Sequence, residues 1–341
     1  MKRKIIFPLI VATTVALGLA GCANTAKTTQ ESESASMDNE QVTNYPVSLE
    51  VSDNQGNKYT ETFDEAPTRV ITNNQSSLEL LLKLGLQDSI IGTIALDNEI
   101  PEELETAFSN INIITESKTE PAKEVIVGMN PDLVIGRAAT FTDEIYGTIE
   151  SLNGMDINVY TQLASLMNTE QSLDNIFEDI ENIGEIFNVE DKANALATEL
   201  SESLKSVEDK VSTLEGEPLK VLVMTAYNDG SYSVFGANST LQNEILEVLG
   251  GTNINEKGGA QALENLMSLN PDVILYVYNN KNSNDSTAIE SLYNNSLIQS
   301  VPAIENKKVF EVSYTEFMGY GYRTIECIEN LAKEMYPELF N

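Results

Sequence analysis

Hydrophobic residues follow two kinds of spacing along this chain. Short apolar runs at 69–72, 133–135, 219–224 and 273–277 have the length of buried strands. Between these runs, leucine and isoleucine recur every three or four residues, as they do on the buried face of a helix. Strands that alternate with helices are typical of a parallel sheet covered on both faces. We therefore expect an α/β fold.

The longest helical pattern lies in the middle of the chain. Apolar residues recur at helical spacing from 173 to 187 and again from Glu190 to Leu214, and neither Gly nor Pro interrupts the second segment. A helix of about 24 residues is about 36 Å long, which is enough to connect two lobes. An ordinary core helix is the alternative, and length alone does not exclude it.

One motif occurs twice. Residues 124–135 and 264–275 each begin with a Glu and continue through apolar residues to Asn-Pro-Asp and a buried strand. Because Pro cannot continue a helix, each copy predicts a short helix, a stop and a strand that enters a sheet. The repeat predicts two similar lobes joined by the long helix. For Glu124 and Glu264 the simplest alternative is that they are solvated residues at helix starts.

The N-terminal segment has the pattern of a secretory signal. Three basic residues at 2–4 precede an apolar run that ends in Leu-Ala-Gly-Cys at 19–22, and the run is too short for a stable membrane span. The small residues before Cys22 resemble a bacterial lipobox, whose Cys is lipidated; cleavage elsewhere or an uncleaved anchor is the alternative. The polar stretch that follows predicts a disordered tether. We expect a body held by lipid on the extracytoplasmic face of the cell membrane.

Composition excludes several classes of protein. Lys and Arg total 20 against 53 Asp and Glu, and the resulting net charge of −33 repels nucleic acid. Histidine is absent, so a Ser-His-Asp triad, a Cys-His pair and a His-rich metal site are excluded. The second cysteine, Cys327, falls on a helix predicted at 323–335, where we expect a packed, inert thiol.

These patterns define the expected organisation of the chain. The fold class is α/β, with two similar Rossmann-like lobes of mainly parallel sheet, one long bridging helix and a ligand cleft between the lobes. The expected segments are a signal peptide (1–21), the lipidated Cys and tether (22–44), a hairpin (45–63), the N-terminal lobe (64–188), the bridging helix (189–214) and the C-terminal lobe (215–341).

From about Phe63 to its end the chain resembles the substrate-binding proteins of iron-siderophore, haem and vitamin B12 ABC importers, a class with one rigid helix between two lobes. The resemblance is carried, in this order, by segments 66–71, 78–86, 130–135, 244–254 and 270–274. It implies a lipoprotein that captures a ferric siderophore or similar chelate and delivers it to a permease. In that family one surface Glu of each lobe docks on Arg residues of the permease dimer, and Glu124 and Glu264 match those positions.

Candidate ligand residues come from loops beyond the carboxyl ends of strands. Arg137 and Arg323 fall on such loops, one in each lobe, and indicate an anionic group on the ligand; pairing with nearby carboxylates is the alternative. Tyr320 and Tyr322 belong to an aromatic loop that suits a ring-rich ligand. The other two candidates are Tyr227 and Asn74.

Three hypotheses follow for the activity. The first is the chelate-binding role, and the second is the same role with a corrinoid or other tetrapyrrole. A haem carrier with His/Met ligands and a zinc or manganese carrier are disfavoured without His, whereas chelated iron needs no protein ligand, so we expect no cofactor and no protein-bound metal. The third is an enzyme related to nitrogenase-type component lobes, which would need cluster-ligating cysteines besides Cys327. We expect a non-enzymatic monomer whose partners are a permease dimer, a small chelate and the membrane.

Overall fold

The computed structural model describes residues 44–115, 120–279 and 285–341. The expected signal peptide, Cys22 and nearly all of the expected tether lie outside the described residues. The described chain starts with an antiparallel hairpin of β1 (Val47–Ser52) and β2 (Lys58–Phe63), as the sequence predicts. In its turn the Asp53 carboxylate accepts hydrogen bonds from the backbone N–H groups of Gln55 and Asn57, which stabilises the tight reversal.

The first lobe contains a sheet of parallel strands in the order β5-β4-β3-β6-β7. Its central strands β3 and β6 are buried along their whole length, which explains their continuous apolar sequence. The strands are β3 (Val70–Thr72), β4 (Ile90–Ile94), β5 (Ile113–Thr115), β6 (Leu133–Gly136) and β7 (Asn158–Thr161). The helices that accompany them are α1 (Gln75–Lys83), α2 (Glu102–Phe108), α3 (Lys123–Gly128) and α4 (Ile149–Asn153), with 3-10 turns η1 (Gln87–Ser89), η2 (Ala138–Thr140) and η3 (Leu163–Ser165).

The second lobe contains a mixed sheet in the order β11-β9-β8-β12-β13, and β10 also pairs with β8. Strands β10, β8, β12 and β13 run parallel, whereas β9 and β11 form an antiparallel edge. The strands are β8 (Leu219–Asn228), β9 (Ser231–Val234), β10 (Gly251–Asn253), β11 (Gly259–Ala262), β12 (Val273–Tyr278) and β13 (Val309–Ser313). The helices are α7 (Thr240–Val248), α8 (Glu264–Leu269), α9 (Asp285–Asn294), α10 (Pro302–Glu305), α11 (Tyr314–Met318) and α12 (Arg323–Met335), followed by the 3-10 turn η4 (Pro337–Leu339).

The two faces of the second sheet belong to different hydrophobic cores. On β8, Val221 and Val223 join the core that also contains the sheet of the first lobe, while Leu222 and Met224 join a separate core under α9 and α10. This division follows from the alternation of side chains along a strand. One continuous hydrophobic core therefore runs from the first lobe into the second.

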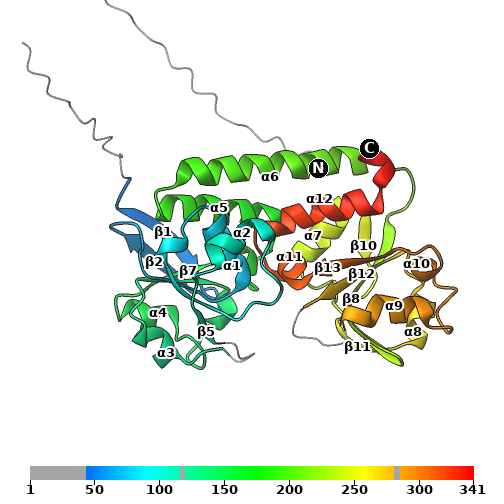
Figure 1. Ribbon diagram of the computed structural model, residues 1–341, viewed down its shortest axis with the longest axis horizontal. Coiled ribbons are helices and arrows are strands. Elements are labelled where there is room, and N and C mark those ends of the chain that lie inside the picture. Colours follow the sequence, from blue (N-terminus) through cyan, green and yellow to red (C-terminus); the bar gives the residue numbers. More distant parts are fainter. Residues whose placement is uncertain (1–43, 116–119, 280–284) are drawn as a thin grey trace, which may run out of the picture. The chain divides into compact units, whose positions relative to one another are not determined.

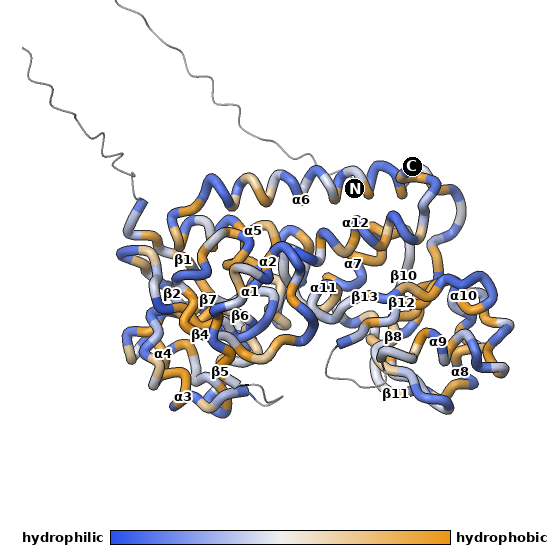
Figure 2. The backbone as a smooth tube through the Cα atoms, viewed as in Figure 1, coloured by the Kyte–Doolittle hydropathy of each residue, from blue (hydrophilic) through white to orange (hydrophobic). Residues whose placement is uncertain are grey.

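Helices α5 (Leu173–Ile186) and α6 (Glu190–Val211) connect the lobes. Helix α6 packs against α5 at one end and against α12 at the other, and Figure 1 shows it lying along both lobes. Hydrophobic and hydrophilic residues alternate turn by turn along it in Figure 2, because only one of its faces is buried. The predicted long helix and the α/β fold class with two lobes are thus confirmed. Cys327 is a buried free cysteine on α12, which has the bounds that the sequence predicts.

The repeated Asn-Pro-Asp motif has the same geometry in both lobes. Asn130 and Asn270 adopt left-handed backbone conformations, with φ of 52° and 50°; Asn130 is two residues after the end of α3, and Asn270 directly follows α8. The carboxylate of Asp132 accepts a hydrogen bond from the backbone N–H of Arg69 at 3.0 Å, and that of Asp272 accepts one from the backbone N–H of Lys220 at 2.9 Å. Each Asp therefore ties its own strand to the start of the neighbouring strand.

Candidate functional site

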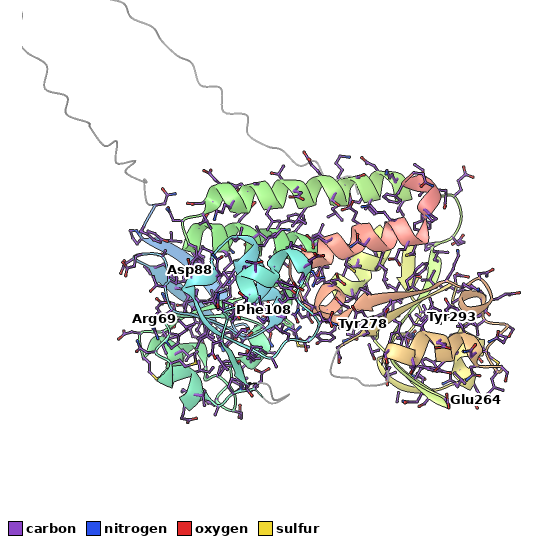
Figure 3. All side chains as sticks on the ribbon, in the orientation of Figure 1. Arg69, Asp88, Phe108, Glu264, Tyr278 and Tyr293 are labelled. Atoms are coloured by element: carbon purple, nitrogen blue, oxygen red, sulfur yellow. The ribbon has the colours of Figure 1, made fainter. Side chains whose placement is uncertain are left out.

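A cavity of about 210 Å³ lies where the two lobes face one another. The first lobe contributes Asn98 and Glu99, from the loop after β4, and Figure 3 shows Tyr278 of the second lobe on the side that faces the first. The remaining lining residues are Ser313 at the end of β13, Glu316 of α11 and Arg323 of α12. Ligands of open α/β sheets bind beyond the carboxyl ends of strands, which is the position of this cavity.

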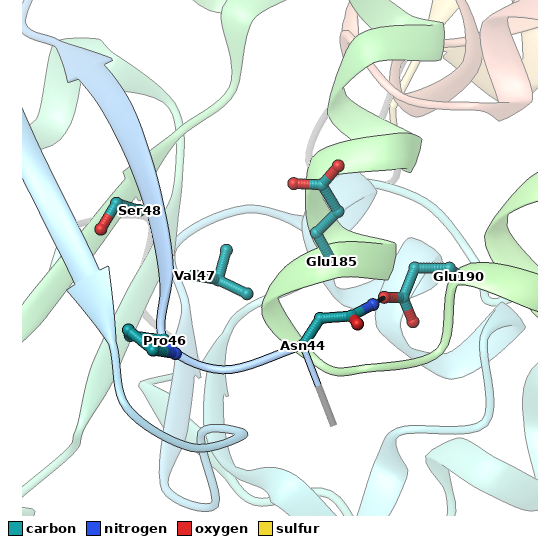
Figure 4. A pocket seen from close by; sticks show the side chains of 6 residues that line it. All are labelled: Asn44, Pro46, Val47, Ser48, Glu185 and Glu190. Atoms are coloured by element: carbon teal, nitrogen blue, oxygen red, sulfur yellow. Dashed lines mark hydrogen bonds between the residues drawn. The ribbon is translucent and has the colours of Figure 1, made fainter. Parts of the chain in front are cut away.

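A larger hollow of about 450 Å³ lies beside Asn44, where the described chain starts (Figure 4). It is lined by residues 44 and 46–48 together with Glu185 and Glu190, and the Asn44 amide donates to the Glu190 carboxylate at 2.8 Å. This hollow is next to the connection between α5 and α6, far from the strand ends that usually present ligand-binding loops. We therefore take the smaller cavity as the candidate ligand site.

Arg323 is already paired with carboxylates in this structure. Its guanidinium contacts Glu79 of α1 at 3.2 Å and Glu316 at 2.6 Å, and its side chain is only 15% exposed. Glu79 is 1% exposed, and this burial raises the pKa of its carboxyl to about 7, although Arg323 and the Gln75 amide both lower that pKa. The ion pair that the sequence left open as an alternative is therefore present, and it joins the two lobes.

Arg137 is enclosed by the loop that carries the predicted aromatic residues. Its guanidinium donates to the hydroxyl of Tyr314 and to the carbonyl of Met318, both at 3.3 Å. The guanidinium carbon lies 5.5 Å from the centre of the Tyr314 ring and 5.4 Å from that of Tyr320, within the range of cation–π contacts. The Nε of Arg137 is buried without a hydrogen-bond partner. The structure thus brings Arg137 of the first lobe and Tyr320 of the second into contact with each other.

Close approach of this loop to the first lobe depends on glycine. A Cβ on Gly321 would lie 2.7 Å from the Cβ of Ser76, at the start of α1. The Ser76 hydroxyl donates to the carbonyl of Gly319, and the Gln162 amide donates to the carbonyl of Tyr320 at 3.4 Å. The loop can therefore lie directly against the first turn of α1.

Of the six predicted ligand residues only Arg323 lines this cavity; Arg137 and Tyr320 do not, and the remaining three are buried elsewhere. Tyr322 is 1% exposed and lies under the Lys83 ammonium, which is 5.6 Å from its ring centre. Tyr227 is buried in the core of the second lobe, where its hydroxyl accepts a hydrogen bond from Asn295 at 2.8 Å. Asn74 is also buried, and its amide donates to Gln162 at 2.7 Å.

Asn98, Glu99 and Tyr278 lie on loops after predicted strands, where the sequence predicts ligand residues, but none of the three is among the named candidates. The strand pattern predicts where these loops lie, but it does not indicate which residue of each loop faces a ligand. Glu79 gave no such signal, because its place in an apolar helical segment looks like that of any solvated Glu.

The two predicted docking residues are exposed on corresponding elements of the two lobes. Glu124 is the second residue of α3 and Glu264 the first residue of α8, and Figure 3 labels Glu264 at the edge of the second lobe. Helices α3 and α8 lie on the side of the body opposite α6 (Figure 1). Each Glu has an exposed apolar neighbour, Val125 (47% exposed) and Met267 (42%).

Among the described residues, no helix combines the length and the apolar character needed to cross a bilayer.

Comparison with known proteins defines the class. The sequence profile of the periplasmic binding protein family matches residues 70–314, and the chain belongs to this family. It is 25% identical over 331 residues to the uncharacterized ABC transporter substrate-binding lipoprotein YvrC of Bacillus subtilis, with 95% of each chain covered. It is 24% identical to the petrobactin-binding protein YclQ of the same organism, with 96% of each chain covered. A crystal structure of a periplasmic binding protein from Veillonella parvula has the same fold, with a TM-score of 0.75, 24% identity and coverage of 87% and 93%. The protein is accordingly a substrate-binding protein of an ABC importer.

Proposed function

We propose that this protein captures a ferric siderophore or similar metal chelate in the interlobe cavity and delivers it to an ABC permease. The observation that carries the proposal is a cavity at the carboxyl ends of strands from both lobes, lined by oxygen-bearing side chains of Asn98, Glu99, Tyr278, Ser313 and Glu316. The chain has no histidine, so a transition metal is best accommodated here when it arrives with its own ligands. The name of the relative YclQ, a petrobactin-binding protein, supports a siderophore as the cargo.

The charges around the cavity favour a neutral or cationic chelate. Glu99 and Glu316 line the cavity, and the only guanidinium in the lining, that of Arg323, is shared between Glu316 and Glu79. Arg137 is likewise enclosed by Tyr314 and Tyr320. An anionic ligand would have to displace these partners, whereas a ligand ammonium would meet carboxylates directly.

Calorimetric titration of the purified protein tests both parts of the proposal. The matched probes are a ferric linear trihydroxamate that ends in a primary ammonium and the same chelate after acetylation of that amine. A ferric tris-catecholate supplies the anionic case and cyanocobalamin the corrinoid alternative. We expect saturable binding of the trihydroxamates, with the ammonium form tighter, and weaker binding of the catecholate. Tightest binding of the catecholate would contradict the charge argument, and binding of cyanocobalamin alone would replace the chelate by a corrinoid.

The same proposal includes the membrane anchor and the permease. Cys22 would carry the lipid that holds the body on the extracytoplasmic face, and the name of the relative YvrC, a lipoprotein, supports this. Replacing Cys22 by Ala should abolish incorporation of labelled fatty acid; unchanged labelling would refute the anchor. Glu124 and Glu264, each exposed at the start of a helix in its own lobe, would contact cationic sockets on the permease dimer.

A further inference from the structure

Asn98 makes hydrogen bonds to both lobes, to the second lobe through its small, buried side chain and to its own lobe through its backbone N–H. Its Oδ1 accepts from the backbone N–H of Thr315 at 2.9 Å and from the Thr315 hydroxyl at 3.0 Å. Its Nδ2 donates to the carbonyl of Tyr278 at 3.2 Å. Its own backbone N–H donates to Oε1 of Gln75 on α1 at 3.0 Å. The residue is 3% exposed, so these bonds are made away from bulk water.

The partners of Asn98 lie at functionally important places in the second lobe. Tyr278 ends the central strand β12 and lines the cavity, and Thr315 is the second residue of α11, which follows β13. Other bonds between the lobes, from Ser76, Gln162 and Arg137, end on the loop at 314–320. Asn98 in addition bonds to Tyr278, the last residue of strand β12 in the second sheet.

We propose that Asn98 is a positioning residue that locks the loop after β4 onto the carboxyl ends of β12 and β13 in the empty protein. The cavity is then closed on this side before a ligand arrives, with Asn98 and Tyr278 held as adjacent parts of its wall. This inference depends on the proposed function only for the identity of the cavity as the ligand site. The lock itself is a property of the protein without ligand.

The amide group is suited to this role because it is both an acceptor and a donor. In Asn98→Asp the acceptor for Thr315 is kept, but an ionised carboxylate oxygen would face the carbonyl of Tyr278. When protonated, the same carboxyl donates a hydrogen to that carbonyl and restores the contact. The groups that surround it and determine where it titrates are Asp97 and Glu99 on its own loop, Glu79 on α1, and Tyr278, Glu316 and Arg323 in the second lobe. Its predominantly acidic surroundings favour the protonated form at mildly acid pH.

Hydrogen exchange of the Thr315 N–H in the ligand-free protein measures the lock directly. This group lies in the first turn of α11, where a backbone N–H has no partner within the helix, so its protection depends on Asn98. We expect Asn98→Ala to lower the protection factor about tenfold, corresponding to one hydrogen bond of about 1.4 kcal/mol. Asn98→Asp should be close to the wild type at pH 5 and lose protection at pH 8.

Three further variants complete the test, two as controls and one as an independent change to the same contact. Asn265→Ala and Asn265→Asp are matched controls, because Asn265 is exposed and its amide donates to Gln261 of its own lobe. The protection of Thr315 should be unaffected in both. Thr315→Val removes the hydrogen bond from the residue 315 hydroxyl to Asn98 but keeps the one from the backbone N–H. Protection of that N–H should therefore fall less than in Asn98→Ala, and this variant can still be measured if the alanine variant fails to fold. Unchanged Thr315 protection in Asn98→Ala, or no pH-dependent recovery in Asn98→Asp, would overturn the proposal. Because no ligand is added, failure of the chelate proposal leaves this result intact.

Discussion

At the residue scale, the two arginines expected to face a ligand are held by other side chains of the protein. Arg323 links Glu79 of the first lobe to Glu316 of the second, and Arg137 lies between two tyrosine rings. The sequence identified both positions because Arg is scarce and each lies on a loop after a strand. The contacts of Arg323 with Glu79 and of Arg137 with Tyr314 join residues more than 100 positions apart, and a local pattern carries no information on such contacts.

Replacing Arg323 by Met should destabilise the empty protein, and more strongly at pH 8 than at pH 5. The substitution leaves the buried Glu79 without its cationic partner, at a cost of about 2 kcal/mol when that carboxyl is ionised. At pH 5 the cost is smaller, because the pKa of Glu79 is about 7 even beside Arg323 and the carboxyl is then neutral. Denaturant unfolding at the two pH values measures the difference.

Lys333→Met, which breaks a more exposed pair with Glu329, should change the free energy of unfolding by less than about 0.5 kcal/mol and serves as the control. An equal loss at both pH values would argue against the ion pair.

Asp179 should make the protein less stable as the pH rises. It is 4% exposed and accepts hydrogen bonds from the Tyr160 hydroxyl at 2.7 Å and the Leu163 N–H at 2.9 Å, and burial raises its pKa from 3.8 to about 7. Because the folded state then binds more protons than the unfolded state between about pH 4 and 7, its contribution to stability is present at low pH and falls through this range. Asp179→Asn removes this dependence.

The difference in free energy of unfolding, variant minus wild type, should therefore be more positive at pH 8 than at pH 5. The variant is thus relatively more stable at the higher pH. An unchanged difference between the two proteins across this range would show that Asp179 does not titrate there. The control is Tyr160→Phe, which removes one hydrogen bond to the Asp179 carboxylate but keeps the carboxyl group. Its free energy of unfolding should still fall as the pH rises, as in the wild type.

At the scale of elements, hydrophobic spacing in the sequence predicted most of the strands and helices that the structure contains. The long helix begins at Glu190 as predicted but ends at Val211, before the predicted Leu214, because residues 212–214 form turns that the apolar pattern does not distinguish from a helix. The antiparallel pair β9 and β11 was not predicted. Its short, partly polar segments lack the continuous apolar runs that identify the parallel strands.

The Asn of the repeated motif has a conformational role that can be tested. Asn270 has a φ of 50° after α8, a backbone region that Gly adopts freely and β-carbon-bearing residues adopt at a cost. Asn270→Ala should lower the free energy of unfolding by about 1 kcal/mol, while Asn270→Gly should change it little. Urea unfolding of the two variants measures this. An alanine variant as stable as the glycine variant would mean that the left-handed conformation carries no cost here.

At the scale of the whole molecule, a continuous hydrophobic core and a set of side-chain bonds connect the lobes in addition to α6. The core runs from the first sheet into one face of the second. Asn98, Ser76, Gln162 and the pair of Glu79 and Arg323 add hydrogen bonds across the interface. We expect these contacts to restrict relative motion of the lobes more than a bridging helix alone would.

Delivery to the permease should depend on Glu124 and Glu264 together. Replacing both by Ala removes two exposed negative charges that would meet cationic sockets, so uptake of the chelate by cells should fall while calorimetric affinity stays unchanged. Binding of the loaded protein to permease in membranes should also weaken with added salt. The control is the double variant Glu199→Ala and Glu202→Ala, which removes the same charge from exposed positions on α6. Uptake at the wild-type rate in the first double variant would show that the two residues are only solvated helix starts.

The position of the metal atom in a crystal of the loaded protein would show directly whether the chelate binds between the lobes. After the protein is crystallised with the ferric ammonium-bearing trihydroxamate, anomalous scattering at the iron edge locates the iron without reference to the fitted ligand. We expect one strong peak between the lobes, with the chelate against Asn98, Tyr278 and Glu316. A peak in the hollow beside Asn44 and Glu190, or a complex with no iron bound, would contradict it.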